Sequence, residues 1–304
     1  MNFSRSMNRR SFLEISLQAT AAALAAPGLL RRADAAENPP WQIGCYTRPW
    51  AEFDYRTAMD DIATAGFKHA GLMTTKSKTG HVITRDTPLE EADQVGREAR
   101  QRGLGIASAW GGDIGAEISV EEGIKGLRRL VDVCAAAGVG DVLLGGVEKE
   151  NLFAPYYKAV SECCAYAAEK KVGLSLKPHG GLNATGPQLR KCLAAITSPY
   201  VKIFYDAGNI LYYSNGKVNP VEDCATLDGV VAGWCVKDFQ AKPKRDVELT
   251  PGDGLVDFQG VFARLKKGGF TRGALVVETL RPGDRKSLVA EAARARAFVE
   301  HLVA

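Results

Sequence analysis

Short apolar segments alternate with amphipathic segments along most of the chain, and each kind predicts a different element. The apolar segments predict strands at Gln42–Cys45, His69–Leu72, Gly105–Trp110, Asp141–Leu144, Gly173–Lys177, Val201–Asp206, Val231–Val236 and Gly273–Val277. Apolar residues at helical spacing predict helices at Tyr55–Ala65, Leu89–Arg102, Val120–Ala137, Tyr156–Lys170, Gln188–Ile196, Phe258–Lys267 and Ser287–Leu302, with a weaker and shorter candidate at Pro220–Leu227. Several of these helices are followed by glycine, a common residue just beyond a helix end.

This alternation predicts the fold class. Strands that are apolar throughout are typical of a parallel sheet covered on both faces, and the intervening helices supply the cover. Eight such units within residues 36–304 favour an α/β fold of the (β/α)8 TIM barrel type, built as a single domain. A doubly wound open sheet is the alternative, but no G-x-G-x-x-G motif follows the first predicted strand.

Residues 1–35 show a different pattern, and we expect them to be removed from the mature protein. Arg9 and Arg10 precede an apolar, alanine-rich run over residues 15–30, and Ala33–Ala35 offers an A-x-A cleavage site. This is the pattern of a twin-arginine export signal. A retained membrane anchor is the alternative, but a span needs about 20 apolar residues. The sequence therefore predicts a periplasmic or otherwise exported protein, with no stable membrane insertion after signal removal.

Charge and cysteine content narrow the classes of partner and cross-link. The chain has a formal net charge of +4, and most of it lies in residues 1–35. The remainder carries about +1, which gives no reason to expect nucleic acid as a partner. The seven cysteines are odd in number and form no C-x-x-C motif. They therefore predict buried free thiols and not a disulfide framework.

Titratable residues follow the last four predicted strands. Functional residues of such barrels lie at the C-terminal ends of the strands. Here these ends carry Lys177 and His179, then Asp206 and Asn209, then Cys235, Lys237 and Asp238, and finally Glu278. Side chains two residues apart on a strand share a side, so we expect Lys177 and His179 to face the same space. Any one of these residues fits an exposed loop or a helix cap, but four consecutive strands favour an active site at one rim.

The same strand ends resemble a known family. LSLKPHGG (Leu174–Gly181), the D-x-G-N after strand six, the V-K-D after strand seven and PGDGLVDF (Pro251–Phe258) are similar to the xylose isomerase-like barrel superfamily of sugar phosphate isomerases and epimerases. The resemblance implies one divalent metal at the rim, held by a Glu, an Asp, a His and a Glu that end strands five to eight. Asp206 and Glu278 match this set, whereas Lys177 and Cys235 occupy the other two positions.

The lysine at a ligand position leaves two interpretations open. In the first, the Lys177 ammonium group replaces the metal and neutralises Asp206 and Glu278, which would otherwise repel one another. In the second, His179, Asp206 and Glu278 form a shifted site for one divalent ion such as Mn, Mg or Zn, with Cys235 as an occasional fourth ligand. A metal-bound and a metal-free protein are both compatible with the sequence.

The resemblance implies an enzyme that moves a proton next to a carbonyl of a sugar or polyol derivative, as an isomerase or epimerase does. We expect Lys177, His179 and Glu278 to be catalytic, and Trp110, Asn209 and Lys237 to bind a small carbohydrate substrate. A lyase or dehydratase that uses the same enolisation is one alternative, and a carbohydrate-binding barrel without catalysis is another. The nuclease chemistry of this superfamily uses many histidines. The chain has four, so we do not expect a nuclease.

Overall fold

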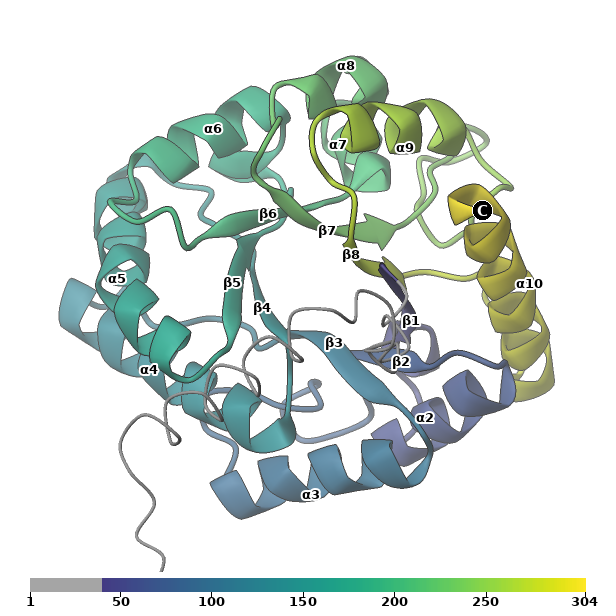
Figure 1. The fold of residues 1–304 in the computed structure, drawn as a ribbon, viewed down its shortest axis with the longest axis horizontal. Helices are drawn as coiled ribbons and strands as arrows, with labels where there is room; N and C mark the ends of the chain where they lie inside the picture. Colours follow the sequence, from purple (N-terminus) through teal and green to yellow (C-terminus); the bar gives the residue numbers. More distant parts are fainter. Residues whose placement is uncertain (1–39) are drawn as a thin grey trace, which may run out of the picture. The chain divides into compact units, whose positions relative to one another are not determined.

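The computed structural model describes residues 40–304, which form a closed barrel of eight parallel strands (Figure 1). The strands follow one another around the barrel in chain order, and β1 pairs with β8 to close it. The view down the barrel shows the helices as an outer ring around the strands. The predicted (β/α)8 fold is confirmed. The predicted export signal lies outside the described residues.

The strand boundaries agree closely with the apolar pattern. The strands are β1 (Trp41–Tyr46), β2 (His69–Leu72), β3 (Gly105–Trp110), β4 (Asp141–Leu144), β5 (Gly173–Leu176), β6 (Lys202–Tyr205), β7 (Val231–Val236) and β8 (Gly273–Val277). Five of them, β2, β3, β4, β7 and β8, have the predicted bounds. β5 and β6 each end one residue earlier than predicted, so Lys177 and Asp206 stand just beyond their strands.

The helices differ from the prediction by one or two residues at several ends and show two larger differences. They are α2 (Tyr55–Thr64), α3 (Leu89–Gln101), α4 (Val120–Ala137), α5 (Glu150–Glu169), α6 (Gly186–Ala194), α7 (Ala207–Tyr213), α8 (Pro220–Ala225), α9 (Phe258–Lys267) and α10 (Arg285–Val303), with short 3-10 turns at Arg48–Trp50 and Gly181–Asn183. First, α5 begins at Glu150 and not at Tyr156. Proline usually marks a helix boundary, but Pro155 lies inside this helix.

The second difference is α7, which the sequence analysis missed. Asp206-Ala-Gly-Asn209 has the composition of a turn, but Asp206 is the N-cap of this helix. Its Oδ1 accepts a hydrogen bond from the backbone N–H of Asn209 at 2.8 Å, which satisfies a donor that the first helical turn leaves free. One oxygen of Asp206 is therefore committed to the helix, and its other oxygen remains for the barrel rim.

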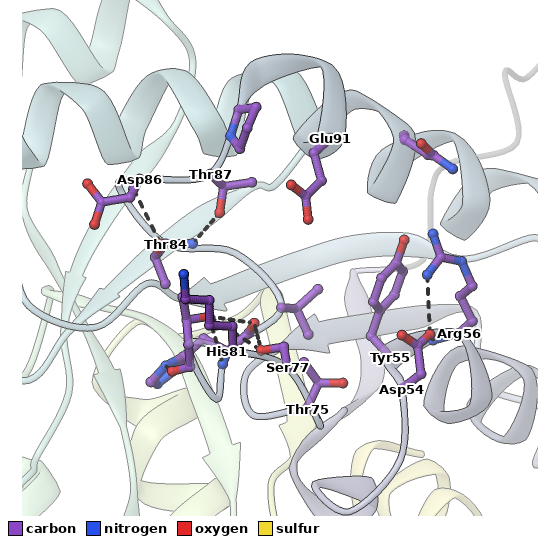
Figure 2. Close-up of a pocket in the computed structure, with 15 residues that line it drawn as sticks. Asp54, Tyr55, Arg56, Thr75, Ser77, His81, Thr84, Asp86, Thr87 and Glu91 are labelled. Carbon is purple, nitrogen blue, oxygen red and sulfur yellow. Dashed lines mark hydrogen bonds and ion pairs between the residues drawn. The ribbon is translucent and has the colours of Figure 1, made fainter.

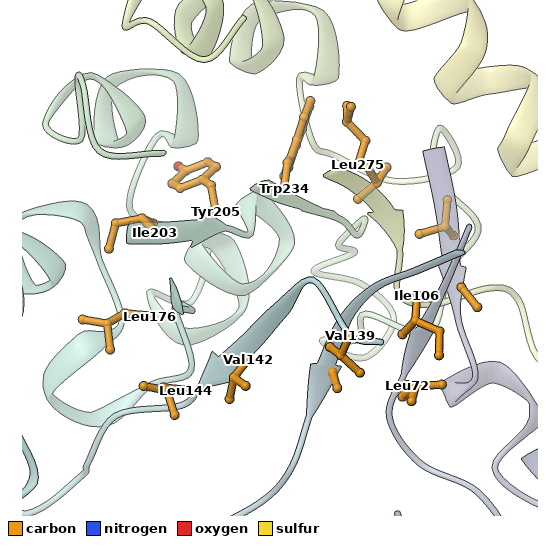
Figure 3. Packing of buried hydrophobic residues seen from close by; sticks show 14 of the residues in the cluster. Leu72, Ile106, Val139, Val142, Leu144, Leu176, Ile203, Tyr205, Trp234 and Leu275 are labelled. Carbon is orange, nitrogen blue, oxygen red and sulfur yellow. The ribbon is translucent and has the colours of Figure 1, made fainter. Parts of the chain in front are cut away.

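Two apolar layers hold the barrel together. The larger layer lies between the strands and the helices, and Figure 3 shows strand residues such as Leu144, Leu176 and Ile203 pointing away from the barrel axis. A smaller layer fills the barrel interior and includes Tyr46 and Phe204. Each large side chain buried in this way contributes about 1.5–3 kcal/mol to the free energy of unfolding. The interior layer forms the base on which the polar groups of the rim rest.

Two further predictions concern the cysteines and the membrane. All seven cysteines are buried and free, as the sequence predicted. Within the part of the chain that the structure describes, no helix combines the length and the apolar character needed to cross a membrane.

The long segment between β7 and α9 is anchored by one buried carboxylate. Asp238 accepts four backbone N–H groups, those of Phe239, Gly252, Gly254 and Val256, at 2.8–3.1 Å. A Cβ on Gly254 would lie 2.4 Å from Asp238 Oδ1, so glycine is required at this position. The PGDG motif therefore wraps around Asp238. Although strand position groups Asp238 with the rim residues, it serves as a loop anchor.

Candidate active site

A cavity of about 500 Å³ opens at the C-terminal rim of the barrel. Its walls combine residues of the loops after β1, β2, β5 and β7 with the last residue of β3 and the residue that follows β8. The lining residues are Arg48, Ala51, Met73, Thr74, His81, Trp110, Lys177, His179, Glu248 and Glu278. A cavity of this size with a few convergent polar groups is the usual form of a small-molecule site.

Lys177 forms the floor of this cavity. Its side chain is 1% exposed, and its Nζ lies 2.6 Å from Asp206 Oδ2 and 3.0 Å from Glu278 Oε2. The predicted contact between this lysine and the two carboxylates is confirmed. Burial alone would lower the pKa of Lys177, but the two carboxylates outweigh burial and raise the pKa above its ordinary value. Lys177 therefore remains an ammonium group.

Lys237 supplies a second ammonium group to the same carboxylates. Its Nζ lies 2.5 Å from Glu278 Oε1 and 3.3 Å from Asp206 Oδ2, and the side chain is 2% exposed. Lys237 was expected to bind substrate, and its Nζ contacts the same two carboxylates as Lys177. The rim cluster consists of these four residues, Lys177, Lys237, Asp206 and Glu278. The sequence contained a signal for this position, because Lys237 lies two residues after Cys235 and its side chain therefore points to the same, inward side.

Arg48 supplies a third cation at the outer edge of the cluster. Arg48 donates to Glu278 Oε1 at 2.7 Å and to Glu248 Oε1 at 2.5 Å. Burial alone would raise the pKa of Glu278, but the positive charges of Lys177, Lys237 and Arg48 hold it well below its ordinary value. Glu278 thus stays ionised inside an apolar barrel because three cations surround it.

Asn209 connects the cluster to the backbone after β5. Its Nδ2 donates to the carbonyl oxygen of Pro178 at 2.7 Å, and its Oδ1 accepts from Lys237 Nζ at 3.1 Å. The side chain is 4% exposed. Both ends of the amide are therefore engaged within the protein. Asn209, expected to bind substrate, is placed to orient Lys237 and the segment that carries His179.

His179 and Trp110 stand above the floor as an aromatic pair. Their ring centroids are 4.8 Å apart, and the ring centroid of Tyr213 lies 5.9 Å from that of His179. His179 is open to the cavity, and within residues 40–304 its ring nitrogens have no hydrogen-bond partner. Partial enclosure by the surrounding residues and the charges of Lys177 and Lys237 lower its pKa to about 4. The imidazole is therefore neutral near pH 7.

The donor atoms that the structure brings together for a metal differ from the predicted set. Asp206, Cys235 and Glu278 each offer one ligand atom, and these atoms lie within 4.8 Å of one another. His179, which the sequence analysis included, is not part of this group. Burial raises the pKa of the Cys235 thiol well above its ordinary value, so the thiolate that a metal needs is disfavoured.

The lysines decide how well this group fits a metal. Two ammonium nitrogens lie within 3.3 Å of the Asp206 and Glu278 oxygens that a cation would use. A divalent ion would have to displace both of them or add its charge to theirs. The site as built does not fit a divalent ion while Lys177 and Lys237 hold the carboxylates.

A separate cavity of about 330 Å³ lies between the loop after β2 and the first turns of α2 and α3. Figure 2 shows that its polar side chains largely bond to their own loop. Ser77 Oγ donates to the carbonyl oxygen of His81, and Thr87 Oγ1 accepts from the backbone N–H of Thr84, both at 2.9 Å. His81 also lines the larger cavity. No chemistry is assigned to this cavity beside α2 and α3.

A family model matches the chain over most of the described barrel. The model described as "Xylose isomerase-like TIM barrel" matches residues 59–300. This range includes the strand ends that build the cavity from β2 onward.

Individual relatives agree with this match. An inosose dehydratase of Histophilus somni is 26% identical over 262 residues, covering 75% of this chain and 83% of the relative. Among solved structures, a xylose isomerase domain protein from Planctomyces limnophilus has a TM-score of 0.66 at 18% identity, covering 86% of this chain and 97% of that one. A D-allulose 3-epimerase from Methylomonas sp. in complex with D-allulose has a TM-score of 0.64 at 17% identity, covering 86% and 96%. At these identities the structural likeness shows the fold.

Proposed function

We propose that this chain, which belongs to the xylose isomerase-like TIM barrel family, catalyses proton transfer next to the carbonyl group of a sugar or polyol. The observation that carries this proposal is the juxtaposition of a buried ammonium group, Lys177, with a neutral imidazole, His179, in one cavity. A carbonyl substrate needs both a positive group for its oxygen and a proton acceptor for its neighbouring carbon.

Lys177 is suited to donate a hydrogen bond to the carbonyl oxygen of the substrate. Because Asp206 and Glu278 keep it protonated, it can donate to the carbonyl oxygen and stabilise the negative charge that develops there. Lys237 adds positive charge from behind the same carboxylates. In this proposal the ammonium pair supplies the charge that the family's metal would supply, and no step requires a metal.

His179 is suited to accept the proton from the carbon next to the carbonyl group. When it removes a proton from the carbon next to the carbonyl, the electrons of the C–H bond form the enolate, whose oxygen lies at Lys177. The new negative charge offsets the cations that lower the pKa of His179, so the imidazole becomes a better proton acceptor as the enolate forms. If a second donor delivers a proton to the opposite face of the same carbon, the product is an epimer. If the protonated His179 returns its proton to the former carbonyl carbon while the neighbouring hydroxyl group passes its proton to the enolate oxygen, the neighbouring carbon becomes the new carbonyl and the product is an isomer.

The same enolate permits a dehydration. If a hydroxyl group lies on the carbon beyond the enolate, the enolate expels it as water, with His179 in its protonated form as the acid. The similarity to inosose dehydratase favours keeping this outcome as the second candidate. Both candidates share the first step, so one experiment tests them together.

Deuterium uptake from D2O tests that first step without requiring a known product. Wild-type protein would be incubated with D-fructose, D-allulose, L-ribulose and an inosose, and carbon-bound deuterium measured by mass spectrometry. We expect uptake into at least one probe, a loss of about 100-fold or more in Lys177→Gln, and no change in the exposed control Lys267→Gln. Binding of the probes with no uptake would instead support a carbohydrate-binding barrel.

Treatment with EDTA separates the metal-free site from a metal site. We expect the uptake rate to survive EDTA, and loss that Mn²⁺ restores would contradict the ammonium-pair proposal. The converse variant Lys177→Glu returns the family's carboxylate and removes one cation, so it should gain Mn²⁺ binding in calorimetric titration. Tight binding by the wild type, no weaker than by the variant, would favour the metal interpretation.

We also propose that the protein acts outside the inner membrane. The twin arginines and the A-x-A sequence of residues 1–35 support this location. The double variant Arg9→Lys, Arg10→Lys should leave the precursor in the cytoplasm, and N-terminal sequencing of exported material should begin near Ala36. Exported material that begins at Met1 would show that the segment is not cleaved.

A further inference from the structure

A second cavity adjoins the one above Lys177. It has a volume of about 260 Å³ and lies over the loops that follow β3 and β4. Trp110 and His179 line both cavities, so the aromatic pair is their common wall. The two cavities therefore adjoin at this pair.

The common wall is fixed by the backbone beneath it. A Cβ on Gly145 would lie 2.5 Å from Cη2 of Trp110, so a glycine is needed for the indole to occupy its place. The ring of His179 then lies against it, with the centroids 4.8 Å apart and the ring planes tilted by 36°. An aromatic ring beside a cavity with polar side chains suits a sugar ring, which is apolar on its C–H faces and polar at its edge.

The charges of the second cavity select against anions. Among the described residues that line it there is no lysine or arginine, whereas Asp113 and Glu148 present exposed carboxylates. Oδ2 of Asp113 also accepts from the backbone N–H of Gly115 at 2.9 Å and lies 3.8 Å from Arg85, which does not line the cavity. Carboxylates accept hydrogen bonds from hydroxyl groups and repel phosphate. The basic segment Lys242–Asp246 lines neither cavity. The chemistry of this cavity thus favours a neutral, hydroxyl-bearing group.

We infer that the substrate has two parts: a keto sugar or keto polyol over Lys177, and a neutral glycosyl group that crosses Trp110 into the second cavity. This inference rests on the proposed function for the first part. It assigns the second cavity, through Asp113 and Glu148, to recognition of the added ring. The substrate class is therefore a glycoside with a carbonyl group, and not a sugar phosphate.

Keto-disaccharides test this directly because they contain fructose with a second ring attached. Binding of lactulose, maltulose, turanose and isomaltulose would be compared with D-fructose and fructose 6-phosphate by calorimetric titration. We expect at least one disaccharide to bind ten-fold or more tightly than fructose, and the phosphate ester to bind no tighter than fructose. Glu148→Trp, which fills the second cavity from an exposed position, should reduce the disaccharide-to-fructose preference at least ten-fold.

Glu169→Trp is the matched control, since Glu169 is exposed at the far end of α5 and lines neither cavity. It should leave the preference unchanged. The inference is overturned if no disaccharide binds better than fructose, if the phosphate ester is preferred, or if Glu148→Trp leaves the preference intact. Disaccharide preference without deuterium uptake would refute the proposed reaction alone, and uptake without preference would refute this inference alone.

Discussion

The two ends of the barrel bury carboxyl groups in opposite ways. At the C-terminal rim, Glu278 is 1% exposed and is contacted by three cations that hold its pKa well below the ordinary value. At the N-terminal base, Asp141 accepts a hydrogen bond from Ser175 Oγ at 2.9 Å, and its Oδ1 has no hydrogen-bond partner among residues 40–304. Burial there raises the pKa of Asp141 to about 7.

This contrast shows that burial alone does not set the charge of a carboxyl group, because charged partners can reverse its effect. Burial acts on both groups in the same direction, toward the neutral form. Only the rim gathers enough positive charge to reverse it. A barrel that carries its chemistry at the C-terminal ends needs charged groups there and gains nothing from a charge at the base.

The largest expected effect comes from breaking the rim cluster. Lys177→Met leaves Asp206 and Glu278 with one buried cation fewer, and removing one partner of a buried ion pair costs about 3–5 kcal/mol. We expect the free energy of unfolding, measured by urea denaturation at pH 7, to fall by that amount. The exposed variant Lys267→Met should change it by less than about 0.5 kcal/mol. Equal losses in the two variants would show that the buried ion pairs of Lys177 contribute no more to the free energy of unfolding than an exposed lysine does.

A second rim carboxylate should be nearly as sensitive for a different reason. Asp238→Asn keeps the shape but offers one acceptor oxygen to four backbone N–H groups. Because hydrogen bonds to a charged group contribute about 1.5–3 kcal/mol each, we expect a loss of about 3 kcal/mol in the free energy of unfolding. Amide exchange should accelerate in residues 239–256 first. Uniform acceleration throughout the barrel would contradict a local anchor.

Much of the site was predictable because its geometry follows from the fold. Once apolar strands alternate with helices, the C-terminal strand ends converge, so Lys177, Asp206 and Glu278 had to meet at one rim. The replacement of a ligand position by lysine could also be found from the sequence.

The remaining features depend on contacts between distant segments. Arg48 meets Glu278 and Glu248 across 230 and 200 positions of sequence separation, and no local pattern predicts which cation joins which carboxylate. Asp238 sits next to Lys237, but successive side chains on a strand point to opposite sides, so one anchors a loop and the other joins the cluster. Composition alone did not distinguish a turn from the cap of α7 at Asp206.

At the base of the barrel a charge-removing substitution should stabilise the protein. The pKa of Asp141 is about 7 in the folded state and about 3.9 in the unfolded chain, so stability falls as the pH rises from 4 to 7 and stays reduced above. Linkage sets an upper limit of about 4 kcal/mol, and because Asp141 is only partly buried we expect about 2 kcal/mol. Asp141→Asn should therefore gain about that much at pH 8 and little at pH 4.

The control for this pH dependence is the exposed Asp86→Asn, for which no gain is expected. Glu278 and Lys177 provide an internal contrast at the rim. The lowered pKa of Glu278 gives stability that is lost only as the pH falls below about 4, and the raised pKa of Lys177 gives stability that is lost only as the pH rises above about 10. Neither contribution changes between pH 5 and 8. A gain in Asp141→Asn that is equal at both pH values would refute the titration of Asp141.

The smallest expected effect lies at the outer edge of the rim cluster, where water reaches the ion pair. Arg48 and Glu248 are 30% and 36% exposed, so their contact at 2.5 Å is screened in a way that the lysine contacts are not. A double-mutant cycle with Arg48→Gln and Glu248→Gln should give a coupling energy of about 0.2–1 kcal/mol, falling further in 1 M salt. Glu278 keeps two buried cations in both variants, so its ionisation should survive. A coupling above about 2 kcal/mol would mean that the edge of the cluster is as shielded as its floor, and that the boundary drawn between them is misplaced.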